Sequence, residues 1–203
     1  MFDLPKSTEI RKPVHKKLIY SKFATELSGD KKERFDADIS RIIITNEISP
    51  ASVNIEEGDK VSSIFVVQIE LKNKNYNDRN IILISKLFGQ KMLLVLHYEE
   101  EYQLVIYETK LLKSEWQIKE QFSLMLNGLD FDSVWENFVT QVSGIDIQEG
   151  NTLTEQINIE SEKLKLKKQI EDLERKARKE TQSKKKFEMF QQINQYHKRL
   201  EEI

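Results

Sequence analysis

The sequence VSSIFVVQIELKNK (residues 61–74) is the stretch that decides the fold of this chain. Its first half is dense in β-branched and other apolar residues, which favours a strand buried on both faces. Polarity returns at Glu70 and Lys72, so the far end of the strand should reach solvent. Side chains two residues apart on a strand point to the same side. We therefore expect a central strand that presents Glu70 and Lys72 together at its exposed end.

The residues that follow this strand predict a helix and further strands. Polar residues 75–78 can cap a helix that ends at Gly89. MLLVLHY (residues 92–98) is a second apolar strand, and the order strand, helix, strand is typical of a right-handed parallel crossover. Residues 102–109 alternate and should return antiparallel, and residues 116–118 can add a short strand.

The residues before the central strand predict a docked arm, a helix and a hairpin. The N-terminal arm has two prolines and enough apolar residues to dock on a surface. Residues 30–46 show helical spacing and stop at Pro50. Residues 52–55 can pair with the central strand through the polar turn at residues 57–60.

A helix should close the globular part of the chain. Asn127-Gly128 marks a turn, and Asp130 or Asp132 can cap the helix. Its apolar stripe consists of Val134, Trp135, Phe138, Val139 and Val142. A stripe at this spacing is typical of a core rather than of a ligand site. The expected fold is α+β, a mixed sheet of four or five strands with helices over residues 1–145.

The composition changes after a polar linker at residues 146–155, and residues 156–203 predict an antiparallel coiled-coil hairpin. Two apolar seams alternate steps of four and three residues. They are Ile159, Lys163, Leu166, Ile170, Leu173 and Ala177, and then Met189, Ile193, Tyr196, Leu200 and Ile203. The seams differ in register, so a break should lie within residues 180–186. Seams this short make a weak coil, which favours packing on the body, on a partner or on a second copy.

Charge is segregated along the chain. The formal net charge is -2, but residues 1–24 and residues 160–203 are each +4 and residues 25–159 are -10. The basic ends could meet phosphate or an acidic protein surface, or could simply be solvated. The absence of cysteine excludes disulfides and thiolate sites. With no leader and no apolar run of about 20 residues, we expect a cytoplasmic protein without a membrane span.

The predicted end of the hairpin is strongly basic. Its cations are Arg175, Lys176, Arg178, Lys179, Lys184, Lys185 and Lys186. Within that span only Glu180 opposes them. Such an end could follow a phosphate backbone, in contacts blind to sequence because no aromatic residues are interleaved. The alternative is that the lysines only keep the hairpin soluble.

Glu70-Leu71-Lys72 matches the E-x-K element of nucleases with the restriction-endonuclease-like fold. In such nucleases the carboxylate helps to hold Mg²⁺ and the lysine stabilises charge near the scissile phosphate. The second carboxylate would have to be Glu56 or Asp59. The alternative is a solvent-side charge pair, with no metal and no cofactor. We interpret His97 as a core histidine or a hydrogen-bonded edge histidine rather than a metal ligand.

Three segments resemble an uncharacterised bacterial family, domain of unknown function 4391: FDLPKSTEI, VQIELKNKN and above all SLMLNGLDFDSVWENFVTQV. The resemblance covers nearly the whole chain and supplies no catalytic residues. Members of that family are often encoded beside helicases and DNA methyltransferases. The resemblance therefore implies a non-catalytic accessory role in a restriction- or phage-defence-type system, with a helicase, a methyltransferase or DNA as partner. A Mg²⁺-dependent nuclease is the alternative.

Overall fold

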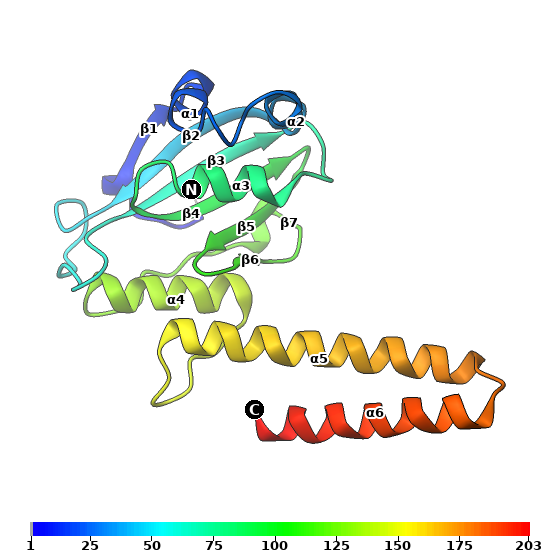
Figure 1. Cartoon of the computed structure of the whole chain (residues 1–203). Coiled ribbons are helices and arrows are strands. Elements are labelled where there is room, and N and C mark those ends of the chain that lie inside the picture. Colours follow the sequence, from blue (N-terminus) through cyan, green and yellow to red (C-terminus); the bar gives the residue numbers. More distant parts are fainter. Residues whose placement is uncertain (1) are drawn as a thin grey trace. The chain divides into compact units, whose positions relative to one another are not determined.

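The computed structural model describes residues 2–203, which form two compact units (Figure 1). The first unit ends at Gly144, and the second spans Ile145–Ile203. The first unit contains every strand and four α-helices, and the second contains two long helices.

The first unit is an α+β fold built on one mixed sheet of seven strands. The strands are β1 (Glu9–Pro13), β2 (Ile39–Ile48), β3 (Ile64–Leu71), β4 (Lys91–Tyr98), β5 (Glu101–Tyr107), β6 (Leu111–Lys113) and β7 (Gln117–Ile118). The order is β1-β2-β3-β4-β5-β6, with β7 also paired to β5. The prediction of four or five strands is wrong, because β1 and β6 have five residues or fewer and carry little periodic signal. β7 lies within the short strand predicted at residues 116–118.

The central position of β3 is confirmed, since two strands lie on one side of it and four, including β7, on the other. β3 and β4 run parallel, joined by α3 (Asp78–Ser85), as the crossover predicts. Asn77 caps α3 by accepting a hydrogen bond from the backbone N of Arg79 at 3.0 Å. β5 returns antiparallel to β4, which is also confirmed.

The helix predicted over residues 30–46 is wrong in its second half. Helix α2 (Asp30–Asp38) ends where β2 begins, and β2 pairs antiparallel with β3. The run from Ile42 to Thr45 is β-branched throughout, which favours a strand once a partner edge is present. Because β2 occupies that edge of β3, the predicted hairpin strand at residues 52–55 is also wrong. Ser52 instead lies in a turn, where its backbone N–H donates to the carbonyl of Ser49 at 2.9 Å.

The N-terminal arm is integrated into the fold. After the 3-10 turn η1 (Lys6–Thr8), β1 pairs with the outer edge of β2, and α1 (Lys16–Lys22) follows. Val14 and Ile19 are buried, whereas Ile10 and Leu18 stay exposed. The sequence predicts an arm that docks on a surface. In the structure the arm is more closely integrated, because it forms one edge of the sheet and part of the core.

Both faces of the sheet are covered with apolar side chains. Helices α1, α2 and α3 share one core with alternate residues of the strands, including Val67 and Ile69 (Figure 1). On the other face Val66 and Leu93 are buried, and α4 (Phe131–Ser143) packs on β5 and β6. The predicted stripe of α4 is buried at all five positions and Asp130 is its N-cap, so both predictions are confirmed.

Asp36 on α2 ties α1 to α2. It accepts hydrogen bonds from Lys16 Nζ at 2.8 Å and from the hydroxyl of Tyr20 at 2.5 Å. Burial raises the pKa of Asp36, but these two donors outweigh burial and bring the pKa below its ordinary value. A carboxyl with a lowered folded-state pKa contributes stability that is present above its unfolded pKa and lost as the pH falls through the folded pKa.

We therefore expect Asp36→Asn to flatten the acid side of the stability profile. Below about pH 5, where an unfolded aspartate begins to bind protons, the unfolding free energy of the wild type should fall more steeply than that of the variant. Urea denaturation at a series of pH values measures this, with Asp59→Asn, an exposed loop carboxylate, as control. Equal slopes for wild type and Asp36→Asn would contradict it.

The second unit consists of α5 (Leu153–Lys179) and α6 (Ser183–Glu202), which contact each other. Thr152 and Glu155 form a capping box at the start of α5. Arg199 of α6 forms an ion pair with Glu162 of α5. Across residues 2–203, no helix combines the length and the apolar content that crossing a membrane requires.

Candidate functional site

A row of four side chains crosses one end of the sheet. Register pairs Arg41 of β2 with Glu70 of β3, Glu70 with His97 of β4, and His97 with Tyr102 of β5. Directly paired residues point to the same face of a sheet. The core that α1, α2 and α3 cover takes up Ile69 and Leu71, so Glu70 and the rest of the row lie on the opposite face.

Three members of this row, Glu70, His97 and Tyr102, form a chain of side-chain contacts. Oε2 of Glu70 lies 2.6 Å from Nδ1 of His97, and Oε1 of Glu70 accepts a hydrogen bond from Nε2 of Gln68. The rings of His97 and Tyr102 are stacked, 4.3 Å between centroids. Burial, and then the charge of Glu70, raise the pKa of Tyr102 above its ordinary value. The interpretation of His97 as a hydrogen-bonded histidine agrees with this geometry.

The row borders a cleft of about 440 Å³ on the same face. Its polar lining consists of Glu9, Arg11, Arg41, Thr45, Asn46, Gln68 and Lys119. Pro13, Ile43 and Tyr102 supply its apolar lining. This volume is within the range of sites for small molecules.

Irregular strand pairing surrounds the cleft. The β1–β2 register shifts between Glu9 and Lys12, and the β2–β3 register shifts on both sides of the segment from Arg41 to Ile44. Within the first shift Arg11 has a φ of 48°, a left-handed conformation that costs a non-glycine residue free energy. Bulges redirect side chains and are frequent beside functional sites.

The four residues proposed for a nuclease are not brought together. Lys72 lies one residue beyond the end of β3, and its Nζ donates to the carbonyl of Asp36 at 2.7 Å. The expectation that Lys72 accompanies Glu70 is therefore wrong, because strand alternation stops at Leu71. Glu56 and Asp59 precede Ile64, the first residue of β3, whereas Glu70 lies near the other end of that strand, about 20 Å from Ile64 at the strand rise per residue. Glu56 forms a bridge with Asp130, the N-cap of α4. Within residues 2–203, no three His, Cys, Asp or Glu side chains form a group that could hold a metal.

The predicted basic cluster lies at the end of α5 and the start of α6. Arg175 pairs with Asp172 at 2.5 Å and Arg178 with Glu174 at 3.7 Å, both within α5. The three lysines from 184 to 186 are exposed in the first turn of α6, which itself contains no acidic residue. The nearby Glu180 interacts electrostatically with Lys185. The sequence analysis missed two exposed aromatic residues beside these lysines, Phe187 (62% exposed) and Phe190 (48% exposed). Both lie outside the apolar seam that begins at Met189, and this position could have identified them as exposed.

Comparison with known proteins now adds to this geometry. The family model described as "Domain of unknown function (DUF4391)" matches residues 2–200. The chain belongs to the DUF4391 family. The match includes the cleft of the first unit and nearly all of the second, so both are parts of the DUF4391 domain. No curated protein and no solved structure matches the chain.

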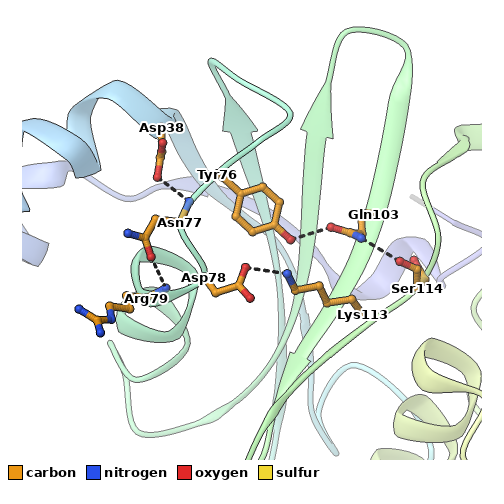
Figure 2. Close-up of polar contacts among 8 residues, drawn as sticks. All are labelled: Asp38, Tyr76, Asn77, Asp78, Arg79, Gln103, Lys113 and Ser114. Carbon is orange, nitrogen blue, oxygen red and sulfur yellow. Dashed lines mark hydrogen bonds and ion pairs between the residues drawn. The ribbon is translucent and has the colours of Figure 1, made fainter. Parts of the chain in front are cut away.

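Opposite the cleft, the DUF4391 sheet carries a second polar cluster that is fully engaged in structural contacts (Figure 2). The hydroxyl of Tyr76 donates to Gln103 at 2.7 Å, and Gln103 donates to the carbonyl of Ser114 at 2.8 Å. Lys113 donates to Asp78 at 2.6 Å. Burial, and then the charge of Asp78, raise the pKa of Tyr76. These contacts hold the start of α3 against β5 and β6 and leave the cleft as the less occupied polar region of the sheet.

Proposed function

We propose that this DUF4391 protein is a non-catalytic accessory protein, whose α5 and α6 form an antiparallel coiled-coil hairpin that holds nucleic acid at its basic end. The observation that carries the proposal is the placement of three exposed lysines, residues 184–186, next to the exposed rings of Phe187 and Phe190. Cations supply affinity for phosphate, and exposed aromatic rings can stack on unpaired bases.

The position of the lysines favours a ligand role over a stabilising one. The N-terminus of a helix carries partial positive charge, so three lysines in the first turn of α6 oppose the helix dipole. A phosphate at this end would be attracted both by the lysines and by the unpaired backbone N–H groups. Lysines that only keep the helices soluble would not need to lie in the first turn, because they would do so equally well anywhere on the helix.

The proposed context is a restriction- or phage-defence-type system, in which a helicase or a DNA methyltransferase of the same locus is the protein partner. The resemblance supports this part of the proposal. Contacts to backbone phosphate and to the faces of bases carry no sequence information. A sequence-blind hold on a strand is what an accessory protein of a DNA-processing enzyme requires.

Fluorescence anisotropy with a labelled single-stranded oligonucleotide tests the proposal. Combining Lys184→Glu, Lys185→Glu and Lys186→Glu should weaken binding by at least tenfold and reduce the slope of log K against log salt by about 2. Acidic residues suit the first turn of a helix, so α6 should stay folded by circular dichroism. Phe187→Ala with Phe190→Ala should reduce the preference for single over double strands.

The matched control combines Lys6→Glu, Lys60→Glu and Lys110→Glu. These lysines are exposed in the first unit, and their replacement changes the net charge by the same amount. The control should bind like the wild type. An equal loss in the control, or no binding by the wild type at low salt, would overturn the proposal.

A further inference from the structure

We propose that the cleft of the first unit binds a phosphate monoester of nucleotide size. Three cations from three elements surround it, namely Arg11 of β1, Arg41 of β2 and Lys119 of η2 (Lys119–Gln121), and Glu9 is the one acid in its lining. Glu9 lies 3.6 Å from Arg11, whose side chain is 79% exposed. The cleft therefore carries an excess of positive charge although residues 25–159 are strongly acidic.

Arg41 is available to a ligand because its natural counter-ion is engaged elsewhere. Its partner across the strands is Glu70, and the two carboxylate oxygens of Glu70 are bound by His97 and Gln68. Arg41 forms no ion pair with any residue in the range 2–203. A planar guanidinium without a carboxylate partner matches the geometry of a phosphate.

The apolar lining and a buried amide indicate that the ligand is larger than an inorganic anion. Pro13, Ile43 and Tyr102 offer flat apolar contact beside the cations. Asn46, which also lines the cleft, is buried, and its Oδ1 has no hydrogen-bond partner in the described part of the chain. A buried acceptor left unpaired is unfavourable. Because Asn46 has no exposed surface, an N–H or O–H donor of a base or sugar would pair with Oδ1 once the Asn46 side chain turns toward the cleft.

The distorted strands around the cleft support a ligand site. A register shift beside Arg11 interrupts the β1–β2 pairing at the sheet edge, and another beside Arg41 interrupts the β2–β3 pairing. Arg11 also has a left-handed backbone. Arg11 is exposed, so burial of its side chain does not account for its strained backbone.

Two sources present this chemistry, a free mononucleotide and the 5′-phosphorylated end of a DNA strand. Calorimetry with adenosine 5′-monophosphate, adenosine and inorganic phosphate, and anisotropy with 5′-phosphorylated and 5′-hydroxyl oligonucleotides, distinguish them. We expect adenosine 5′-monophosphate or the 5′-phosphorylated strand to bind best, and which of them does identifies the source. Arg41→Ala and Arg11→Ala should each weaken that binding by at least tenfold.

Lys12→Ala is the matched control. Lys12 is adjacent to Arg11 and exposed, but it is outside the lining of the cleft, so it should bind like the wild type. The proposal is overturned if adenosine binds as well as its monophosphate, if inorganic phosphate alone binds, if no probe binds, or if Lys12→Ala weakens binding as much as Arg41→Ala. Circular dichroism confirms that each variant is folded.

The test separates this inference from the function proposed for the helices. In the variant with glutamate at positions 184, 185 and 186, binding of the 5′-hydroxyl strand should be lost, whereas the preference for a 5′-phosphate or for adenosine 5′-monophosphate should remain. In Arg41→Ala the 5′-hydroxyl strand should still bind, whereas the preference for a 5′-phosphate or for adenosine 5′-monophosphate should be lost. Each of the two proposals can therefore be refuted without the other.

Discussion

Phe138→Ala should lower the unfolding free energy of the first unit by about 3–5 kcal/mol. Phe138 is fully buried on α4, which packs on β5 and β6. Removing its ring loses apolar burial and leaves a cavity that the rigid sheet cannot close. Chemical denaturation followed by tryptophan fluorescence measures the effect, since Trp116 and Trp135 both lie in the first unit.

The matched control for Phe138→Ala is Leu129→Ala. Leu129 is 89% exposed and stands just before α4, so its truncation should change the unfolding free energy by no more than about 0.5 kcal/mol. Similar small changes for both variants would show that α4 does not cover the sheet. In that case this face of the sheet would be largely uncovered, and the cleft would not stand out as its open part.

Phe35→Ala should have a comparable effect on the other face, about 3–5 kcal/mol. Phe35 is the buried residue of α2, and its ring meets that of Tyr20 edge-on at 6.0 Å. It belongs to the core that α1, α2 and α3 form with the sheet. The same fluorescence-detected denaturation measures it, because the first unit should unfold cooperatively.

Leu18→Ala, on the exposed side of α1, is the control for Phe35→Ala, since Leu18 is 47% exposed. It should lose less than about 1 kcal/mol. A small loss for Phe35→Ala would mean that α2 contributes little to the core. The placement of Lys72 against the carbonyl of Asp36, away from Glu70, would then have no firm support.

The candidate site was predictable only in part. Glu70 stands out in the sequence because polarity returns there at the end of an apolar run. His97 and Tyr102 are 27 and 32 residues further along the chain, and Arg41 is 29 residues before it. The register of β2, β3, β4 and β5 aligns them, and no local pattern encodes that register. Lys72 was misplaced because the residue at which β3 ends depends on α2.

The sequence by itself determined the elements whose apolar residues lie close together along the chain: the central strand β3, its parallel neighbour β4 with the crossover helix α3, and the buried stripe of α4. Burial of such a run is favourable whatever the rest of the chain does. Only the tertiary structure decided that residues 39–48 form a strand and that the cleft exists. Ile39 to Ile48 could satisfy their backbone groups in a helix or in a sheet, and the free edge of β3, which is distant in sequence, makes the sheet the better choice.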